Sequence, residues 1–342
     1  MCCGMQAFRA LLILLFGVIV LVGMGIYDRY PYPSCDLEES KIFVPNNQRS
    51  SDFAYLFMLS SNSYFPCLAV ALHSLKQTGT KHDVVVLVTD NIWEELDDAL
   101  RSLHTIPIRV PGVRNPSAKA TRRHLRDNFT KLRAWQLVEY SKIIYSDSDF
   151  IFTKNCDDLF ELPDIVYAGR NFITTQGKWP DPKTFNAGFM VLEPSAETFC
   201  DMQFASVGFT SRTGGDQPFQ NMYWNNTWKE FNYKIDAANA NVYFTRRKDW
   251  NATAIRSIHY TKATNPCNTK FQDDIRQAWE EFDENGFPAE NPLVMWIQAR
   301  DNLLAAHPEF NGIFDTCGFM QGWNDGGQAA QPLLLSRSLG FL

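Results

Sequence analysis

Two carboxylates stand one residue apart in the segment Asp147-Ser148-Asp149, directly after the apolar run Lys142-Ile143-Ile144-Tyr145. A divalent cation such as Mn²⁺ or Mg²⁺ prefers oxygen ligands and bridges readily to a diphosphate. Alternating residues point the same way while the chain stays extended, as it does at the end of a strand. The alternative is a solvated turn rich in Asp and Ser. The position after a buried strand favours a metal site formed by Asp147 and Asp149.

Two further segments carry polar side chains beside glycines. In Phe185–Leu192, Asn186 and a glycine precede an apolar run, so that the backbone could approach a ligand closely, although an ordinary turn before a strand has the same pattern. In Gly214-Gly215-Asp216-Gln217, Asp216 stands near a helix start. Its carboxylate would either cap that helix or hydrogen-bond a sugar hydroxyl and stabilise a cationic sugar centre.

A histidine ends the apolar segment Ile255-Arg256-Ser257-Ile258-His259. A neutral imidazole there could complete the shell of a metal, whereas a lone histidine is more often a structural residue. The sequence alone leaves both interpretations of His259 open.

Alternating strand and helix patterns must position these residues. Helical spacing is found over 68–79, 93–103 and 218–223, and the stretch 129–140 is amphipathic. Short apolar or β-branched runs typical of buried strands cover 53–59, 84–88, 106–110 and 142–145. The alternation predicts an α/β fold with a mainly parallel central sheet, whose ligands bind at the carboxyl ends of the strands.

The composition is that of a globular protein rather than a disordered one, and its charge pattern disfavours a nucleic-acid partner. The chain has 342 residues, of which 45% are hydrophobic and 20% charged, and a formal net charge of −6. It carries no basic stripe, so that an electrostatic footprint for nucleic acid is missing. The short basic run Arg122-Arg123-His124 with Arg126 is either a solvated face or an anion rim over a phosphate site.

The N-terminal region predicts a membrane anchor. Residues 10–26 (ALLILLFGVIVLVGMGI) contain no charge, and Arg9 precedes them. A helix of this length spans roughly 25 Å, and the flanking arginine predicts a cytoplasmic N-terminus with a lumenal bulk. A cleaved signal peptide is the alternative. We therefore expect a single-pass type II protein of the Golgi or endoplasmic reticulum membrane, with a cytoplasmic tip and anchor at 1–27 and a short stem at 28–51.

Cysteines and glycosylation acceptors are compatible with a secretory lumen. Six of the 8 cysteines follow the apolar run without any C-x-x-C spacing, so that a zinc site is disfavoured and their connectivity stays open. Asn-x-Thr acceptor sequences begin at Asn128, Asn225 and Asn251. These acceptors support the lumenal location weakly, because an asparagine-rich chain contains several by chance.

Taken in order, the segments resemble glycosyltransferase family 8, in its glycogenin-like and galactinol-synthase-like branch. Besides the motifs above, the likeness includes Phe53-Ala54-Tyr55, His73-Ser74-Leu75, Thr78-Gly79-Thr80-Lys81-His82, Phe129-Thr130-Lys131-Leu132-Arg133-Ala134-Trp135, Glu139-Tyr140-Ser141-Lys142 and Asn155-Cys156-Asp157-Asp158-Leu159-Phe160. The resemblance implies a GT-A (Rossmann-like) domain over 52–270. The likeness fades after Lys270, and helical patterns at 277–282 and 292–306 predict a C-terminal helical extension and tail at 271–342.

The resemblance also implies a function and roles for single residues. It implies transfer of a hexosyl group from a UDP-sugar to a glycan, lipid-linked or protein acceptor with retention of configuration, usually with Mn²⁺ and with Mg²⁺ as the second choice. By motif, the metal ligands would be Asp147, Asp149 and His259. Ser60 and Tyr64 would lie in the loop that receives the uridine, and Lys131 would contact the donor's phosphate or sugar. The transferred sugar would be faced by Asn186, Asp216 and Gln217.

Two departures from the family pattern affect these expectations. The lysine expected before a proline after the histidine is Asn265, so that a phosphate contact is lost or moved, and Lys262 is the candidate to supply it. The acid expected before the paired glycines is Thr213. Two other classes of function remain: a glycoside hydrolase, which would also use paired carboxylates but no metal, and a non-catalytic lumenal sugar-binding protein of the same fold.

Overall fold

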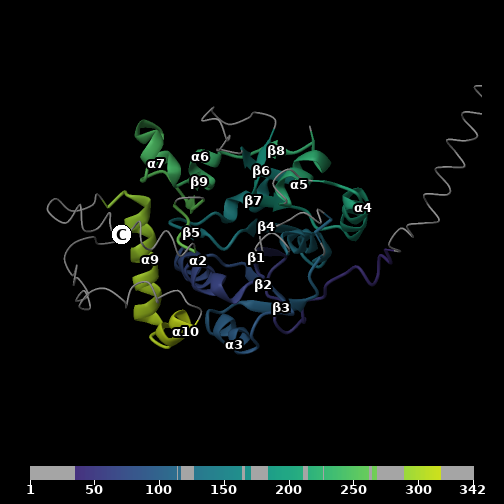
Figure 1. Cartoon of the computed structure of the whole chain (residues 1–342), viewed down its shortest axis with the longest axis horizontal. Helices are drawn as coiled ribbons and strands as arrows, with labels where there is room; N and C mark the ends of the chain where they lie inside the picture. Colours follow the sequence, from purple (N-terminus) through teal and green to yellow (C-terminus); the bar gives the residue numbers. More distant parts are fainter. Residues whose placement is uncertain are drawn as a thin grey trace, which may run out of the picture.

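The computed structural model describes residues 35–113, 115–116, 127–163, 166–170, 184–210, 215–225, 227–261, 264–267 and 289–316. Within them, a central sheet has the strand order β3-β2-β1-β4-β7-β6-β8, and a small sheet has the order β5-β10-β9 (Figure 1). The strands are β1 (Phe53–Leu59), β2 (Asp83–Thr89), β3 (Ile106–Val110), β4 (Lys142–Ser146), β5 (Phe150–Phe152), β6 (Val166–Arg170), β7 (Phe185–Leu192), β8 (Lys229–Glu230), β9 (Ala238–Asn239) and β10 (Ser257–His259).

The helices fill the connections between these strands. The α-helices are α2 (Phe65–Gln77), α3 (Glu95–Ser102), α4 (Ala196–Ser206), α5 (Gln217–Tyr223), α6 (Tyr233–Asp236), α7 (Asn241–Thr245), α9 (Pro292–Ala306) and α10 (Phe310–Thr316). The 3₁₀ helices are η1 (Asn62–Tyr64), η3 (Asn128–Gln136), η4 (Asp157–Glu161) and η5 (Arg247–Asp249).

The central sheet is mostly parallel. Strand β1 pairs in parallel with β2 and β4, and β2 does so with β3. Strand β7 is antiparallel to both β4 and β6, and β8 is parallel to β6. The prediction of an α/β fold with a mainly parallel central sheet is therefore confirmed. Because β1 and β4 are parallel, their carboxyl ends meet at one edge, where the Ser148 hydroxyl donates to the Met58 carbonyl at 3.3 Å.

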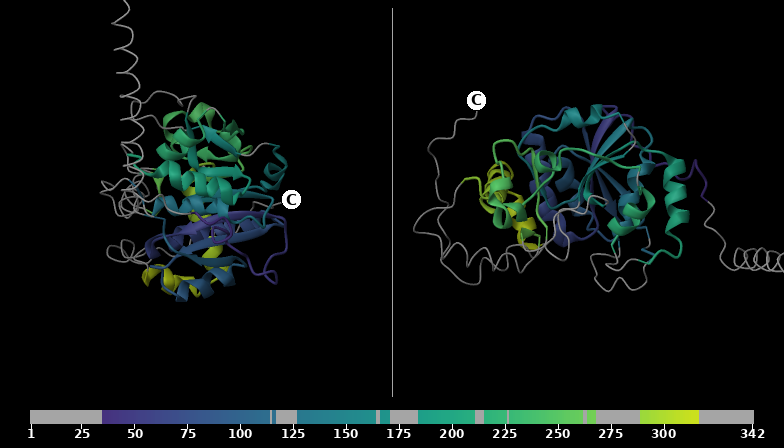
Figure 2. Two further views of the ribbon diagram at one scale, coloured as in Figure 1. Left: turned by 90° about the vertical axis from the view of Figure 1, so that its right-hand side faces the viewer. Right: turned by 90° about the horizontal axis from the view of Figure 1, so that it is seen from above.

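The parallel strands are buried on both faces, which explains their continuous apolar runs. Alternate residues of β1 belong to different cores: Tyr55 and Phe57 to one, Ala54 and Leu56 to the other. Helices α2, α9 and α10 cover the first core, while η3, α4 and α5 cover the second. Figure 2 shows these layers from two further sides, with α9 and α10 far from α4.

Most predicted elements are found, and two differ in kind. The strands expected at 53–59 and 106–110 have those bounds, and the helix expected at Pro292–Ala306 is α9. The amphipathic stretch 129–140 forms a 3₁₀ helix over Asn128–Gln136, tethered where the Thr130 hydroxyl accepts from the Val113 amide at 2.9 Å. Asn186 does not precede its strand but lies within it, because it is paired with Gly169 of β6. The helix expected at 277–282 lies outside the described residues.

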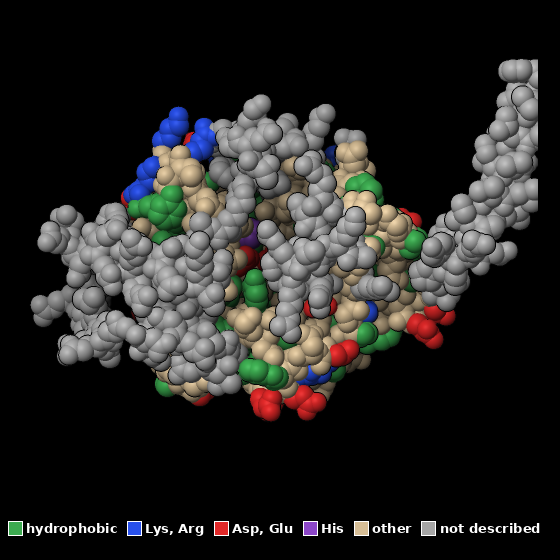
Figure 3. Space-filling view, viewed as in Figure 1, with side chains coloured by type: hydrophobic (Ala, Val, Ile, Leu, Met, Phe, Trp, Pro, Cys, Tyr) green, Lys and Arg blue, Asp and Glu red, His purple; other side chains and the backbone are tan. Residues whose placement is uncertain are grey.

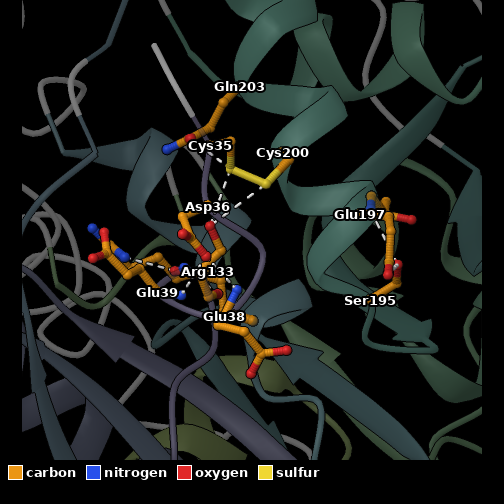
Figure 4. Close-up of a disulfide and its surroundings, with 12 residues drawn as sticks. Cys35, Asp36, Glu38, Glu39, Arg133, Ser195, Glu197, Cys200 and Gln203 are labelled. Carbon is orange, nitrogen blue, oxygen red and sulfur yellow. Dashed lines mark hydrogen bonds between the residues drawn. A yellow bond between two sulfur atoms is a disulfide. The ribbon is translucent and has the colours of Figure 1, made fainter.

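Two disulfides connect distant parts of the chain. Cys35 is bonded to Cys200 and joins the segment before β1 to α4 (Figure 4). Cys67 is bonded to Cys267 and joins the first turn of α2 to the loop after β10. Cys156 is a buried free thiol. These pairings, which sequence left open, fix both flanks of the sheet.

The predicted membrane anchor at residues 10–26 lies outside the described part of the chain. Among the residues that are described, none of the helices combines the length and the apolarity that crossing a bilayer requires.

Candidate metal and donor site

Three potential metal ligands gather at the carboxyl edge of the parallel strands. Asp147 follows β4, Asp149 precedes β5, and His259 ends β10. Strand β10 is antiparallel to β5 and pairs His259 with Phe150, while the Tyr260 amide donates to the Asp149 carbonyl at 2.9 Å. One ligand atom from each of the three side chains lies within 4.8 Å of the others. In Figure 3 a histidine and acidic side chains are visible inside a hollow of this face.

The donor set fits a divalent cation. Asp149 Oδ1 is buried and receives no hydrogen bond from the described residues, although His259 Nε2 is 3.2 Å away. A buried carboxylate oxygen without a donor is rare in a folded protein and suits a metal ligand. Two carboxylates and one imidazole are ligands that Mn²⁺ accepts. The residues predicted to hold the metal thus lie together, and the buried Asp149 Oδ1 is left for it.

Gly188 keeps the space between these ligands open. A Cβ atom at this position would lie 2.6 Å from His259 Cε1, 2.8 Å from Asn186 Oδ1 and 2.9 Å from Asp147 Oδ2. The imidazole has little room to withdraw, because it stacks on the Phe150 ring with centroids 4.2 Å apart. The glycine is required here for close approach of the β7 backbone.

Lys131 forms a buried ionic bridge beside the metal ligands. Its Nζ lies 3.0 Å from Asp147 Oδ1 and 3.2 Å from Asp216 Oδ2, and it donates to the Ala187 carbonyl at 3.2 Å. Burial lowers the pKa of Lys131, but the two carboxylates outweigh burial and raise it. The ammonium therefore stays charged. It also lies 5.0 Å from the centroid of the Tyr145 ring.

Asp216 is held inside the protein and does not cap its helix. The residue is 3% exposed, and its side chain makes no capping hydrogen bond to α5. Instead Oδ2 meets Lys131 and accepts from Gln220 Nε2 at 2.7 Å. Burial raises the pKa of Asp216, whereas Lys131 lowers it and Asp147 raises it. Of the two roles open at the level of sequence, capping is excluded.

The side-chain amides of Asn186, within β7, and of Gln217, at the start of α5, both contact the β7 backbone. Asn186 Oδ1 accepts from the Gly188 amide at 2.7 Å, and Gln217 Oε1 accepts from the Ala187 amide at 3.2 Å. Their oxygens are thus occupied by the β7 backbone. Among the described residues, no acceptor is found for either amide nitrogen.

Ser60 and Tyr64 lie where β1 leads into α2. The Ser60 carbonyl accepts from Asn91 Nδ2 at 3.0 Å, which joins the ends of β1 and β2. Tyr64 ends η1 and is half-buried. Burial raises the pKa of its hydroxyl, and the charges of Asp149 and Asp147 raise it further.

Some predicted residues cannot be placed, and others were missed. Lys262, Gly214, Thr213 and the basic run 122–126 lie outside the described residues. Sequence reasoning missed Tyr145, whose hydroxyl donates to Asp147 Oδ1 at 2.9 Å, and Gln220. It noted Asn265 only as a departure, although Asn265 Nδ2 donates to Asp149 Oδ2 at 2.7 Å. The signal for Tyr145 was its position two residues before Asp147, at the end of the strand.

Curated relatives of the chain are sugar transferases. It is 37% identical over 183 residues to a putative UDP-glucuronate:xylan alpha-glucuronosyltransferase 5 of Arabidopsis thaliana. The alignment covers 52% of this chain and 30% of the relative. It is 26% identical over 288 residues to glycogenin-1 of Homo sapiens. This alignment covers 80% of this chain and 79% of the relative. The chain spans about a third of the length of the Arabidopsis relatives that it matches.

Solved structures of glycosyltransferases also resemble the fold. The galactosyltransferase LgtC, with donor and acceptor sugar analogues, aligns with a TM-score of 0.49 and 14% identity over 76% of this chain and 99% of that chain. GlyE of Streptococcus pneumoniae TIGR4 aligns with a TM-score of 0.48 and 17% identity over 74% of this chain and 63% of that chain.

The family itself is shown by sequence. The family model for glycosyl transferase family 8 matches residues 55–269, which include each of the residues that form the site. Together with the parallel sheet and the ordered motifs, this match means that the chain belongs to glycosyl transferase family 8.

Proposed function

We propose that this protein is a retaining glycosyltransferase that moves a hexosyl group from a UDP-sugar to a glycan or other acceptor, with a divalent cation at Asp147, Asp149 and His259. The observation that carries the proposal is the convergence of these three ligands, with Asp149 Oδ1 left without a hydrogen bond, beside the buried Lys131. We propose Mn²⁺ before Mg²⁺, because an imidazole ligand suits Mn²⁺ better than the strictly oxygen-seeking Mg²⁺.

The residues around the ligands have separate roles in this proposal. A bound divalent cation supplies positive charge that stabilises the diphosphate leaving group. Lys131 orients Asp147 through its contact with Oδ1, and its charge adds to the positive potential at the strand ends. Asp216 holds Lys131 from the other side, so that we assign it a role in positioning the lysine rather than in touching the sugar.

The amides of Asn186 and Gln217 would donate to hydroxyls of the transferred sugar, since their oxygens are already bound to β7. Ser60 and Tyr64 would hold the uridine at the end of β1. Retention needs no protein nucleophile if the acceptor hydroxyl attacks the anomeric carbon on the face from which UDP leaves. In that step the bond from carbon to acceptor oxygen forms, the bond to the UDP oxygen breaks, and the proton passes to the departing diphosphate.

Release of UDP from a panel of UDP-sugars tests the proposal. The panel includes UDP-glucuronate, the donor in the names of the Arabidopsis relatives, together with UDP-glucose, UDP-galactose and UDP-xylose. We expect release that EDTA abolishes, that Mn²⁺ restores and that Asp149→Asn removes. Release that persists in EDTA, or in Asp149→Asn with added Mn²⁺, would contradict the metal site. A glycan array with the best donor then searches for the acceptor.

We further propose that residues 10–26 anchor the protein in the Golgi or endoplasmic reticulum membrane with residues 28–342 in the lumen. Two disulfides support an oxidising compartment. The acceptor Asn251 is exposed, whereas Thr130 of the acceptor sequence at Asn128 is fully buried. We therefore expect glycosylation at Asn251 and none at Asn128. A mass shift that is smaller in Asn251→Gln than in wild type and unchanged in Asn128→Gln is the expected result, and an unglycosylated protein would count against a lumenal location.

A further inference from the structure

Asn265 contacts a predicted metal ligand from a loop that carries no other residue of the proposed site within the described residues. Its Nδ2 donates to Asp149 Oδ2 at 2.7 Å, and its Oδ1 accepts from the Cys267 amide at 2.8 Å. One side chain therefore joins the Asp149 carboxylate to the backbone of the loop. The family pattern has a lysine here, which could neutralise a phosphate, whereas an amide carries no charge and can only direct a hydrogen bond.

The loop is fixed to the protein through Cys267. The disulfide to Cys67 places the two Cα atoms 5.9 Å apart. Cys67 is fully buried in the first turn of α2, three residues after Tyr64. The bridge therefore ties the segment around Asn265 to the same helix start that carries the proposed uridine contact. A loop held at this point cannot carry the amide away from Asp149 without moving α2.

The consequence falls on the two oxygens of Asp149. Oδ2 is occupied by the Asn265 amide, whereas Oδ1 is buried, has no hydrogen bond from the described residues and lies 3.2 Å from His259 Nε2. A donor on one oxygen fixes the rotation of the carboxylate and so determines where the other oxygen points. Partners of this kind, which contact a ligand and not the metal, tune metal affinity in many proteins.

We infer that Asn265 is a positioning residue that turns Asp149 toward a divalent cation, and that the Cys67–Cys267 bridge holds Asn265 in place. The inference rests on the proposed metal-dependent function. It assigns this disulfide a role in the site, whereas the Cys35–Cys200 bridge joins α4 to the segment before β1 and touches none of the proposed ligands.

Asn265→Ser tests the first part in the full chain. A serine hydroxyl can still accept from the Cys267 amide, which preserves the turn, but it is too short to reach Asp149. We expect the Kd for Mn²⁺, measured by titration calorimetry without nucleotide, to rise about 10- to 100-fold. The affinity for UDP in EDTA should stay unchanged, since a general loss of structure would weaken both. Asn265→Ala is the second variant, with the same expectation.

The two disulfides provide a matched pair for the second part. Cys67→Ser/Cys267→Ser should raise the Kd for Mn²⁺ in the same direction as Asn265→Ser, whereas Cys35→Ser/Cys200→Ser should lower the Tm and leave that Kd unchanged. An Asn265→Ser protein with wild-type Mn²⁺ affinity overturns the role of Asn265, and equal effects of the two double variants overturn the role of the bridge. A wild-type chain that binds no Mn²⁺ instead overturns the proposed metal site, and the inference with it.

Discussion

Replacing Gly188 with alanine places a methyl group among three atoms of the metal site. Nonbonded carbons rest about 3.5–4.0 Å apart, so that a Cβ at 2.6 Å from His259 Cε1 requires a relative movement of about 1 Å. The ring is stacked on Phe150, and the Gly188 carbonyl accepts from the Asp147 amide at 2.8 Å, so that neither withdraws easily. Metal–ligand distances tolerate changes of only about 0.2 Å. A movement of this size should therefore disrupt the ligand geometry.

We expect Gly188→Ala to lower Mn²⁺ affinity by at least about 10-fold, by comparison with milder changes around metal ligands, and to abolish detectable metal-dependent UDP release. Overpacking should also lower the free energy of unfolding by about 1–3 kcal/mol. Calorimetric titration with Mn²⁺ and urea unfolding measure the two effects. The protein should remain folded, because Asp147 and Asn186 have flexible side chains that take up part of the movement.

Gly312→Ala in α10 is the matched control. A Cβ there meets no atom within 4 Å, so that the substitution should raise helix stability by about 0.5–1 kcal/mol and leave Mn²⁺ affinity unchanged. The reasoning would be refuted by a folded Gly188→Ala protein that binds Mn²⁺ as tightly as wild type and releases UDP at the wild-type rate.

Three further substitutions test the surroundings of the site. Lys131→Met leaves Asp147 and Asp216 without their shared cation, and we expect the free energy of unfolding in urea to fall by about 3–5 kcal/mol. The control Lys81→Met, at an exposed residue, should lower it by less than about 0.5 kcal/mol. Equal losses in the two variants would contradict the ionic bridge of Lys131. Tyr145→Phe removes the hydroxyl that donates to Asp147 Oδ1, so that the free energy of unfolding should fall by about 1–3 kcal/mol and Mn²⁺ should bind more weakly. An unchanged Mn²⁺ affinity would show that Tyr145 stabilises the fold and does not contribute to the metal site. Burial raises the pKa of Asp157, but hydrogen bonds from Thr80, Asn155 and Tyr55 and the nearby His82 outweigh burial and lower it. Its ionised form therefore stabilises the protein above the unfolded-state pKa of about 3.9, and this contribution is lost as the pH falls through the folded-state pKa. Asp157→Asn should lower the Tm at pH 7, and the difference in Tm from wild type should shrink below about pH 4. A Tm difference that persists below pH 4 would refute the stabilising role of ionised Asp157. The control is Asp98→Asn, which changes an exposed carboxylate.

The sequence predicted those parts of the molecule that depend on local pattern. The β1 run Phe53–Leu59 is apolar on both faces and was predicted as a buried strand, which is confirmed. Asp147 follows such a strand, so that its place at the sheet edge was also predictable. His259 could be grouped with the aspartates only through family resemblance, because its proximity depends on the pairing of β10 with β5.

Contacts that depend on packing or cross-links were not accessible to sequence reasoning. Asp216 looked like a helix cap because a short polar residue before a helix usually is one. In the structure the carboxylate of Asp216 pairs with the buried Lys131 instead of capping the helix, because an unpaired ammonium in the interior would be far less stable. Asn265 reaches Asp149 through a loop bridged to α2, and no local pattern encodes the pairing of Cys67 with Cys267.

The two disulfides also interleave along the chain. Cys35 and Cys67 are synthesised first, but their partners, Cys200 and Cys267, follow only after separations of 165 and 200 residues. Four cysteines allow three pairings, and Cys156, which stays reduced in the core, is synthesised before either correct partner. Early thiols that oxidise at once would therefore pair wrongly. Correct oxidation must wait until α2 and α4 have docked on the sheet, so that maturation of this protein is sensitive to the oxidant and disulfide isomerase supply of the cell that makes it.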